Sequence, residues 1–473
     1  MKILYVASEA LPFCKTGGLA DVAGSLPQAL AENGEEVAVI LPLYGSISGD
    51  WRKKMTFRRY IYVDLSWRHL YCGLFSMEMD GVTWYFVDNE QYFNRSHLYG
   101  EFDDGERFAF FCRAVVSLLP SLDWMPDVIH CNDWQTALVP IYLRDAAARW
   151  GDIRSIHTVF TIHNVEYQGR FGADAAEDLF GLDAGWYHNG TLAMDGDVNL
   201  MKGAMLTSDA VTAVSPTYAS ELRYAYYAHG MEGIVNMCWS KMHGVLNGID
   251  MKRYDPAQDS ALTERYTPDH MAGKAACREA LLKEMDLEEG GPVLAIVSRL
   301  VAHKGLDLVC EVLDGIMETG VRLVVLGQGD RQYEDFFRWA MGRYPGRVAA
   351  RLTYSQDMSM RIYSGADLFL MPSKSEPCGL SQMIAMRYGA VPIVRETGGL
   401  KDTVHPYEAW CDGGNGFTFS NYNAFDMLFV VRQATGLYQD DPEAFARLRR
   451  RGMTGDYSWK KSAGEYAAIY RSL

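Results

Sequence analysis

Short apolar runs that alternate with amphipathic helical patterns constrain the fold of this chain more than any other feature. Runs rich in Val and Ile, bounded by Gly or polar residues, are typical of strands buried on both faces. Helical patterns lie between them at Leu19–Glu32, Arg107–Leu118 and Leu306–Met317, which predicts parallel sheets joined by right-handed crossovers. The predicted strands are Ile3–Ala7, Val37–Leu41, Val82–Val87, Val128–His130, Thr158–Ile162, Ala210–Val214, Val293–Val297, Leu323–Leu326, Val348–Leu352, Leu368–Met371 and Val391–Val394.

The strands fall into two series that together exceed a single open sheet. The turn-forming stretch Gly244–Asp250 separates the series, so we predict an N-terminal domain of residues 1–244 and a second domain of residues 245–455. The expected fold is α/β, with two Rossmann-like doubly wound domains facing each other across a deep cleft. Ligands of such sheets bind outside the carboxyl ends of the strands, which would line that cleft.

Charge and cysteine usage limit the partners and the cellular location. The chain has 45 Lys and Arg against 60 Asp and Glu, and its net charge of −15 repels nucleic acid and anionic membranes. No apolar run approaches the roughly 18 residues that span a bilayer, and the N-terminus lacks a signal-peptide pattern. Nine scattered cysteines without a Cys-x-x-Cys pair are typical of reduced thiols. We therefore expect a cytoplasmic protein, whose oligomeric state the sequence does not set.

A glycine-containing turn follows the first strand. The segment Lys15-Thr16-Gly17-Gly18-Leu19-Ala20-Asp21-Val22 opens a helix, where glycines let the backbone approach a ligand and N–H groups attract an anion. A tight turn with a solvated lysine is the simpler interpretation of a lone Gly-Gly pair. The adjoining Lys15 and the position at a strand's carboxyl end favour a binding site.

Polar side chains end two further strands of the first domain. Thr161-Ile162-His163-Asn164 ends one strand and His130-Cys131-Asn132-Asp133-Trp134 ends another, which directs both segments toward the predicted cleft. Taken alone, each segment is more typical of a structural helix cap, since Asn and Asp are good capping residues.

Two segments of the second domain carry charge beside a turn. Arg299 ends a strand and Lys304 precedes the next helix, and two cations beside a helix N-terminus suit a diphosphate. The alternative, a solvated basic turn, fits less well in a chain of net charge −15. The stretch Ser375-Glu376-Pro377-Cys378-Gly379-Leu380-Ser381-Gln382 shapes a second turn with Glu376 as a fixed acceptor, although a capped turn with a solvated glutamate is equally compatible. Thr397-Gly398-Gly399-Leu400 mirrors the Gly-Gly turn of the first domain.

The sequence lacks the motifs of several other classes of functional site. Gly327-Gln328-Gly329 misses the last glycine of the dinucleotide Gly-x-Gly-x-x-Gly, which counts against an oxidoreductase. No phosphate-binding Gly-x-x-x-x-Gly-Lys-Ser/Thr, zinc His-Glu-x-x-His or nucleophile-elbow Gly-x-Ser-x-Gly occurs. Asp195-Gly196-Asp197 is interpreted as a turn rather than a cation site.

Taken in order, these motifs resemble the family of bacterial glycogen synthases and plant starch synthases. The resemblance covers nearly the whole chain, from Lys2 to the Tyr457-Ser458-Trp459 segment, and its specificity lies in the ordered conjunction of weak motifs. It implies a GT-B glycosyltransferase in which residues 456–473 form a helix that packs back on the N-terminal domain. The implied reaction transfers glucose from ADP-glucose to the non-reducing end of an α-1,4-glucan such as glycogen, with retention of configuration. The preference for ADP-glucose over UDP-glucose rests on the resemblance alone.

The resemblance also implies roles for particular residues. It assigns catalysis to Glu376, Arg299, Lys304 and His163, with Arg299 and Lys304 stabilising the leaving diphosphate and needing no metal. It assigns substrate binding to Lys15, Gly17, Gly18, Asp21, Asp133, Asn164, Asn247, Tyr354, Cys378, Gly379, Leu380, Thr397, Gly398 and Gly399. Many retaining enzymes of this fold have a second glutamate eight positions after the first, where this chain has Ile384; Gln382 fits the synthase subgroup.

Two alternatives stay open at this stage. A retaining glucosyltransferase with a small acceptor would elongate a free sugar but ignore glycogen. A catalytically silent glucan-binding protein would be expected to lack Glu376, Arg299 or Lys304, and the sequence has all three.

Overall fold

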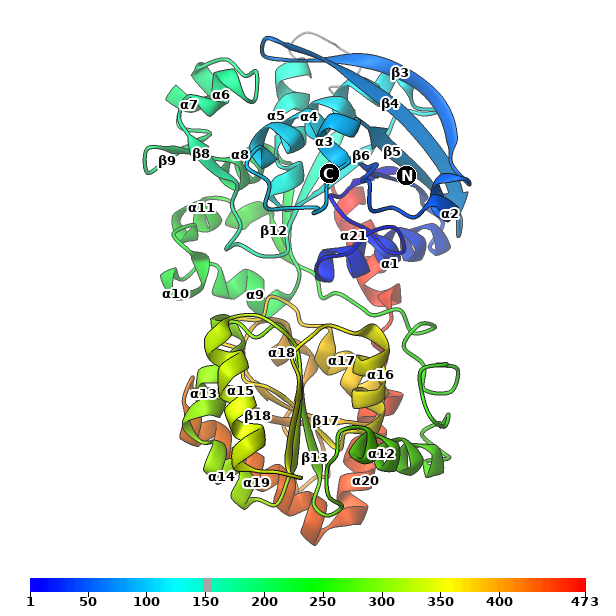
Figure 1. Cartoon of the computed structure of the whole chain (residues 1–473). Helices are drawn as coiled ribbons and strands as arrows, with labels where there is room; N and C mark the ends of the chain where they lie inside the picture. The colour runs from blue at the N-terminus through cyan, green and yellow to red at the C-terminus, as the bar shows by residue number, and fades with distance from the viewer. Residues whose placement is uncertain (148–154) are drawn as a thin grey trace. The chain divides into compact units, whose positions relative to one another are not determined.

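The computed structural model describes residues 1–147 and 155–473, which form two compact units (Figure 1). Unit 1 comprises Met1–Gly248 and Trp459–Leu473, and unit 2 comprises Ile249–Ser458. The first unit ends four residues later than the predicted boundary after residue 244. Val245 explains the difference, because its N–H donates to the carbonyl of Ala213 in the sheet of unit 1 (2.9 Å).

Unit 1 is built on a nine-stranded sheet of order β12-β11-β7-β6-β1-β2-β5-β4-β3. The seven strands from β12 to β5 are parallel, whereas β4 and β3 pair antiparallel at one end. The strands predicted for this half of the chain are confirmed. The strands are β1 (Lys2–Val6), β2 (Glu36–Pro42), β3 (Thr56–Leu65), β4 (Arg68–Met79), β5 (Val82–Asp88), β6 (Val128–Asn132), β7 (His157–Ile162), β11 (Ala210–Ala213) and β12 (Met242–Gly244).

The helices of unit 1 cover the buried central strands. Apolar residues of α1 (Gly18–Glu32) and α4 (Asp104–Leu118) are buried, as the helical patterns at Leu19–Glu32 and Arg107–Leu118 predict. The C-terminal helix α21 (Trp459–Arg471) contacts α1, and its Tyr470 hydroxyl lies 2.7 Å from Nδ1 of His130 on β6. Shorter helices are α2 (Gly49–Arg52), α3 (Glu90–Phe93), α5 (Leu138–Ala147), α6 (Ala175–Asp178), α7 (Gly185–His188), α8 (Leu200–Thr207), α9 (Pro216–Glu221), α10 (Ala225–Ala228) and α11 (Glu232–Met237).

The edge strand β12 and two further parts of unit 1 have no counterpart among the predicted strands. The antiparallel ribbon β3–β4 escaped prediction because most of β3 is exposed and therefore lacks a continuous apolar run. A small sheet of order β8-β10-β9 was missed because its strands are very short. The turn expected at Asp195-Gly196 is confirmed, since both residues have positive φ (54° and 87°) and join β9 (Ala193–Met194) to β10 (Asp197–Asn199).

Unit 2 contains a six-stranded sheet of order β15-β14-β13-β16-β17-β18, with every pair parallel. In chain order this is 3-2-1-4-5-6, the doubly wound Rossmann arrangement. The five strands predicted here are confirmed, and β18 is additional. The strands are β13 (Val293–Val297), β14 (Arg322–Leu326), β15 (Val348–Arg351), β16 (Leu368–Met371), β17 (Val391–Arg395) and β18 (Phe417–Phe419).

Alternate side chains of the six strands share one face of the sheet and pack with helices of unit 2 in a core that includes Ile296, Val325 and Phe337. The single helix predicted at Leu306–Met317 is wrong: the structure has two short helices, broken at Val312. Among residues 1–147 and 155–473 no helix has both the length and the hydropathy to cross a bilayer. The helices are α12 (Ala272–Glu284), α13 (Leu306–Glu311), α14 (Leu313–Glu318), α15 (Arg331–Arg343), α16 (Gln356–Gly365), α17 (Ser381–Arg387), α18 (Gly398–Thr403), α19 (Ala424–Asp440) and α20 (Pro442–Thr454).

Candidate active site

In each unit several candidate residues follow the strands that flank the reversal of strand order. In unit 1 that point lies between β1 and β6, which precede the Lys15 turn and Asp133. In unit 2 it lies between β13 and β16, which precede Lys304 and Glu376. Ligands of doubly wound sheets bind beside this switch point, at the carboxyl ends of the strands. Topology therefore brings together residues that are far apart in the sequence.

The Gly-Gly turn of unit 1 is held by Glu9, a residue that the motif did not include. Glu9 is 2% exposed, and its carboxylate accepts bonds from the N–H of Thr16 (2.5 Å), the hydroxyl of Thr16 (2.7 Å) and the N–H of Gly17 (3.2 Å). The expectation that free N–H groups here await an anion is therefore wrong for Thr16 and Gly17. An acidic residue shortly before a Gly-Gly turn was the signal that could have identified Glu9.

Two further features of this turn are the ion pair of Lys15 and the space over Gly18. Nζ of Lys15 forms an ion pair with Oδ2 of Asp21 (2.7 Å), so its charge is balanced within the turn. A Cβ on Gly18 would meet nothing within 4 Å, whereas one on Gly17 would lie 3.6 Å from Oε1 of Glu9. Open space therefore lies over Gly18, where the backbone is accessible to a ligand.

Asp133 connects the ends of β6 and β7. Its backbone is left-handed (φ 55°), and its Oδ1 accepts bonds from the N–H groups of His163 (2.8 Å) and Asn164 (3.4 Å). It makes no capping bond to the short 3₁₀ turn that follows, so the cap interpretation of this side chain is wrong. Burial raises the pKa of Asp133 to about 7, although the two N–H groups lower it. The carboxyl group thus changes charge near neutral pH.

His163 is fixed as a neutral imidazole. Its Nε2 lies 2.9 Å from Oδ1 of Asn132, which also accepts from the hydroxyl of Tyr5 (2.9 Å). The amide nitrogen of Asn132 donates to the carbonyl of Val6 (2.9 Å), so its oxygen faces the histidine and Nε2 must be the protonated nitrogen. Burial lowers the pKa of His163 to about 3. His163 is therefore uncharged at neutral pH and does not serve as a cation for phosphate.

The shifted pKa of Asp133 predicts a pH-dependent stability. Because the folded pKa of about 7 lies above the ordinary value of 3.8, the unfolded chain ionises first, and this group's contribution to stability falls as pH rises from about 4 to about 7. Asp133→Asn removes the effect. The melting temperature of the variant minus that of the parent should therefore rise between about pH 4 and about pH 7 and stay constant above that range. Calorimetry at several pH values measures the difference; a constant difference would contradict the raised pKa.

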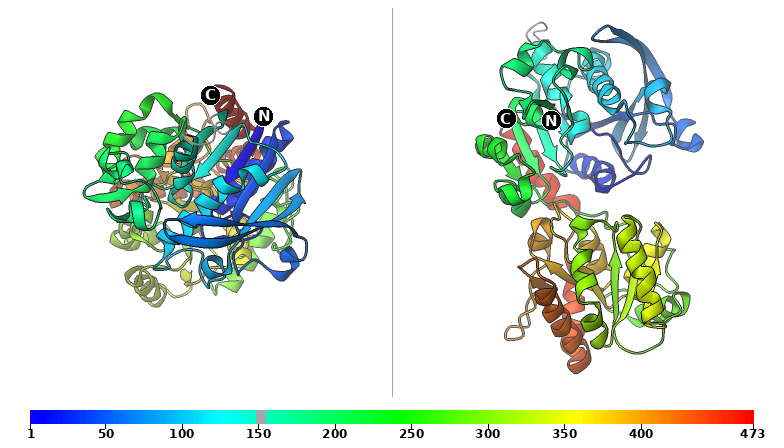
Figure 2. Two further views of the ribbon diagram at one scale, coloured as in Figure 1. Left: turned by 90° about the horizontal axis from the view of Figure 1, so that it is seen from above. Right: turned by 60° about the vertical axis from the view of Figure 1, so that its left-hand side comes forward.

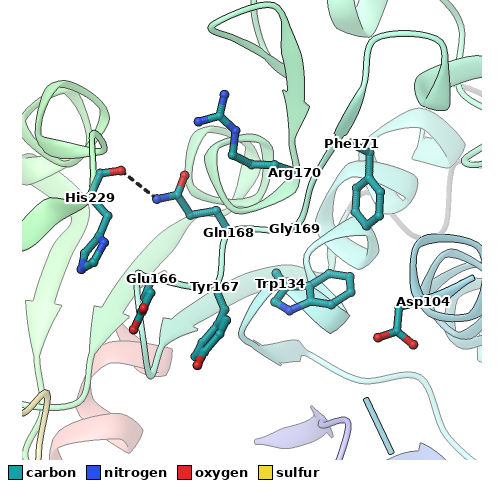
Figure 3. A pocket seen from close by; sticks show the side chains of 9 residues that line it. All are labelled: Asp104, Trp134, Glu166, Tyr167, Gln168, Gly169, Arg170, Phe171 and His229. Carbon is teal, nitrogen blue, oxygen red and sulfur yellow. Dashed lines mark hydrogen bonds between the residues drawn. The ribbon is translucent and has the colours of Figure 1, made fainter. Parts of the chain in front are cut away.

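A pocket of about 540 Å³ opens beside this cluster (Figure 3). Trp134, which follows Asp133, forms part of its wall with Tyr167 and Phe171. Gly169 has positive φ (66°), and a Cβ there would lie 2.9 Å from the Trp134 ring, so glycine lets the chain pass closely under the indole. The amide of Gln168 donates to the carbonyl of His229 (3.0 Å), which joins two sides of the wall. The pocket offers aromatic faces with polar groups between them. Its lining also includes Asp104, Glu166 and Arg170.

The two predicted asparagines of unit 1 have different surroundings. Oδ1 of Asn164 accepts from the N–H of Glu166 (3.0 Å) and shapes the start of the pocket wall. Asn247 is 5% exposed, and its Oδ1 has no hydrogen-bond partner among the described residues. This buried amide oxygen therefore keeps its capacity to accept a hydrogen bond.

In unit 2 the structure pairs Lys304 with Glu376. Nζ of Lys304 donates to Oε2 of Glu376 (2.7 Å), and the same oxygen accepts from the hydroxyl of Ser373 (2.9 Å). Burial on its own raises the pKa of Glu376, but the charge and hydrogen bond of Lys304 and the bond from Ser373 lower it below its ordinary value. Glu376 is 7% exposed and remains a carboxylate. Ser373 was missed because a serine at a strand end carries no distinctive pattern.

Arg299 and Tyr354 are exposed side chains at strand ends. The guanidinium of Arg299, after β13, has no hydrogen bond or ion pair with any residue in ranges 1–147 and 155–473. Tyr354 follows β15, is 62% exposed, and its hydroxyl donates to Oε1 of Gln356 (2.8 Å). Arg299 thus presents a cation to solvent, and Tyr354 presents an aromatic face.

The two predicted loops of unit 2 pack directly on each other. A Cβ on Gly398 (φ 45°) would lie 1.9 Å from the carbonyl oxygen of Glu376, and one on Gly399 would lie 2.1 Å from that of Cys378. The N–H of Gly399 donates to the carbonyls of Glu376 and Pro377 (3.2 Å each). These glycines are therefore needed for contact between the two backbones. Gln382 braces the same region, since its amide nitrogen donates to the carbonyl of Gly379 (2.8 Å).

The other predicted members lie in the same assembly. Cys378 is 5% exposed beneath the turn, Leu380 precedes α17, and Thr397 is fully buried before α18. The structure thus brings Glu376, Cys378, Gly379, Leu380, Thr397, Gly398 and Gly399 together in unit 2.

The backbone contact at Gly399 predicts a strong effect of one methyl group. Gly399→Ala would force Cβ into Cys378, which overpacks the turn and is expected to lower the stability of unit 2 by about 3 kcal/mol. Gly342→Ala in α15 is the matched control, because a Cβ there meets nothing within 4 Å and alanine favours the helix by about 0.5–1 kcal/mol. Thermal unfolding compares the two. Equal melting temperatures would mean that the turns are not in contact.

No group of three or more His, Cys, Asp and Glu side chains suited to a metal ion occurs in the parts of the chain that the structure describes.

Comparison with known proteins places both clusters in one family. Residues 2–237 match the family model described as starch synthase catalytic domain, and residues 278–434 match that described as glycosyl transferases group 1. The chain is 46% identical over its whole length to a glycogen synthase of Geobacillus thermodenitrificans, covering 98% of that protein, and 45% identical to one of Bacillus cereus strain Q1, covering all of it.

Solved structures agree with this match. The catalytic domain of Starch Synthase IV from Arabidopsis thaliana, bound to ADP and acarbose, is similar with a TM-score of 0.92 at 33% identity, over 99% of this chain and 98% of that one. Sucrose-phosphate synthase from Thermosynechococcus elongatus, at 16% identity and a TM-score of 0.61 over 100% of this chain and 98% of that one, shares the fold. Two Rossmann-like units with these matches define a retaining glycosyltransferase of the GT-B class. The chain belongs to the family of bacterial glycogen synthases and plant starch synthases, as its motifs predict.

Proposed function

We propose that this protein transfers glucose from ADP-glucose to the non-reducing 4-hydroxyl of an α-1,4-glucan such as glycogen, retaining the anomeric configuration. The observation that carries the proposal is the pair of Lys304 and Glu376, 2.7 Å apart at the switch point of unit 2. A cation and an ionised acceptor held together suit a substrate that joins a diphosphate to a polyol.

The donor is proposed to bind at the unit 2 cluster. Breaking its glycosidic bond places negative charge on the departing diphosphate, and Arg299 and Lys304 would stabilise that charge. Glu376 would accept hydrogen bonds from hydroxyls of the donor glucose, with the backbone of Cys378–Leu380 beside it. Thr397, Gly398 and Gly399 hold the second backbone of this cradle.

The nucleotide is proposed to be adenosine diphosphate. The ADP found with the similar starch synthase structure supports this choice. The exposed ring of Tyr354, at the end of β15, offers a face on which a base would stack. ADP-glucose should therefore be a better donor than UDP-glucose.

The acceptor is proposed to bind at the unit 1 cluster. A glucan chain presents apolar sugar faces and many hydroxyls, which suits the aromatic and polar walls of the pocket beside Trp134 and Tyr167. Asp133, Asn164 and Asn247 would bind acceptor or donor hydroxyls, and His163 would line the reacting face. Lys15 and Asp21 would complete this side, together with Gly17 and the accessible backbone of Gly18.

Retention is proposed to occur by attack on the face that the diphosphate leaves. Retention through a covalent intermediate needs a carboxylate close to the anomeric carbon on the opposite face. The motifs supply Glu376 as the carboxylate of the donor cluster, where Lys304 engages it. We therefore assign proton transfer from the acceptor hydroxyl to the leaving phosphate, without an enzyme-bound sugar.

Two further expectations belong to this proposal. Since Arg299 and Lys304 supply positive charge at the diphosphate, activity should persist in a chelator. We also place the protein in the cytoplasm, where its nine cysteines, most of them buried, would stay reduced thiols.

The experiment is to incubate the protein with labelled ADP-glucose, glycogen and EDTA, and to digest the product with an enzyme specific for α-1,4 bonds. Label should enter the polymer and be released by digestion. Parallel reactions with UDP-glucose and with maltose as a small acceptor test the donor and acceptor choices. Transfer to maltose without transfer to glycogen would contradict the polymer assignment, and loss of activity in EDTA would contradict metal independence.

A further inference from the structure

The ribbon of β3 and β4 carries a row of exposed aromatic rings that the proposed reaction does not use. Figure 1 shows the ribbon at the margin of unit 1, and the right-hand view of Figure 2 shows it on the side of that unit away from α21. One face of the ribbon presents the rings of Phe57, Tyr60, Tyr62, His69, Tyr71 and Phe75, here called the aromatic ribbon face.

Strand register explains why these side chains share a face. Tyr62 pairs with Tyr71, Tyr60 with Gly73, and Phe57 with Phe75, and alternate residues of a strand point to one side. The other side of β3 is buried through Val63 and Leu65 (1% and 0% exposed).

The rings form ordered diagonal pairs. Tyr60 stacks with Tyr71 at a centroid distance of 5.9 Å, and Tyr62 stacks with His69 at 4.6 Å with the planes 11° apart. Gly73 makes the first pair possible, because a Cβ there would lie 2.7 Å from the hydroxyl of Tyr71. Tyr60 and Tyr62 nevertheless remain 58% and 54% exposed. The rings are thus ordered by stacking and still exposed to solvent, and a contiguous exposed aromatic patch is typical of a binding site.

Some charges around this face are paired, and the carboxylate of Asp88, which is opposite Gly73 in the register, lies beside Tyr71. Arg58 donates to both carboxylate oxygens of Asp123 (2.8 and 2.7 Å), and Nδ1 of His69 lies 2.6 Å from Asp64. The face therefore offers aromatic rings, tyrosine hydroxyls and acceptor carboxylates. That chemistry matches a neutral polyol whose sugar rings have apolar faces and hydrogen-bonding edges.

A second copy of the chain is a poorer occupant, although β3 is an edge strand. The strand has an irregularity between Phe57 and Arg59, and its exposed positions include Arg58, Arg59 and Asp64. Bulges and charged side chains are the devices that keep edge strands from pairing with another sheet.

We propose that the aromatic ribbon face binds a chain of the α-glucan polymer as a second docking site, an inference that rests on the proposed function. Four strands separate β3 from β6 in the sheet, which places the face roughly 24 Å from the strand that carries Asp133. Docking there would hold the polymer while its ends are extended elsewhere. Short acceptors would gain nothing from it.

The test compares Tyr60→Ala/Tyr62→Ala with Phe425→Ala/Phe429→Ala, which removes two rings of similar exposure (64% and 61%) from α19 of unit 2. Retardation in gels that contain glycogen gives the dissociation constant without turnover. The ribbon variant should bind about tenfold more weakly, while the control should bind as the parent does. Tyr60→Phe/Tyr62→Phe, which keeps the rings and loses the hydroxyls, should bind with an affinity between the two. The KM for glycogen should rise in the same variant, with maltotriose kinetics unchanged.

Unchanged retardation of the ribbon variant would overturn the inference. So would a change from dimer to monomer in sedimentation with glycogen binding intact, which would assign the face to a second copy. Adding Glu376→Gln to each protein separates docking from catalysis. If the parent protein transfers no glucose, but its binding of glycogen is still lost in Tyr60→Ala/Tyr62→Ala, the proposed function is refuted and the docking site is not.

Discussion

Replacing Lys304 with alanine is expected to lower the rate of glucose transfer about a hundredfold or more. The change removes a cation that would stabilise the diphosphate and leaves the Glu376 carboxylate, now without its ion-pair partner, beside the same negative charge. The affinity for ADP should fall together with turnover, since ADP carries the diphosphate. Initial rates with ADP-glucose and inhibition by ADP measure the two effects.

Lys283→Ala is the control for this variant, because it removes an exposed lysine from α12 in the same unit. Breaking a largely buried ion pair is also expected to cost Lys304→Ala about 3 kcal/mol of stability. Rates are therefore compared at a temperature where calorimetry shows both proteins folded. A folded Lys304→Ala protein with parental turnover would remove this lysine from the catalytic machinery.

Glu376→Gln should lower turnover to a similar extent, about a hundredfold, with a different signature. Glutamine keeps the shape and can still accept the bond from Ser373, but it cannot supply a carboxylate to the sugar hydroxyls or to Lys304. If Glu376 acts on the glucose, the affinity for ADP should stay within about threefold of the parent value, corresponding to less than 1 kcal/mol. Equal loss of ADP affinity and turnover would contradict this division of roles.

The double variant tests whether the pair acts as a unit. Residues in one ion pair give strongly non-additive effects, so Lys304→Ala/Glu376→Gln should be little slower than the slower single variant. Multiplying the two single effects would instead show that the residues act independently.

The sequence predicts the buried framework better than its surface additions. Parallel strands such as Val293–Val297 are buried on both faces and produce continuous apolar runs, so their prediction succeeded. The exposed edge strand Thr56–Leu65 alternates and carries arginines and tyrosines, and its place beside β4 follows from tertiary pairing. The break at Val312 likewise has no Gly or Pro to announce it.

The candidate site divides in the same way. Strand ends in parallel sheets share an edge, so the sequence predicts that Lys304 and Glu376 lie in one region. It does not predict which groups bond to or contact each other. Glu9 accepts hydrogen bonds from the N–H groups of Thr16 and Gly17, and Gly399 allows its backbone to contact that of Cys378. These pairings depend on distances between segments that sequence spacing does not contain.

The central claim is that the two clusters serve the transfer of glucose to a glucan. Parallel time courses of ADP release and of label entering glycogen test it most directly. The account predicts equal rates of both in the presence of glycogen, and little ADP release without an acceptor, because water is a poor substitute for the sugar hydroxyl. Release of ADP with free glucose and no polymer growth would contradict it.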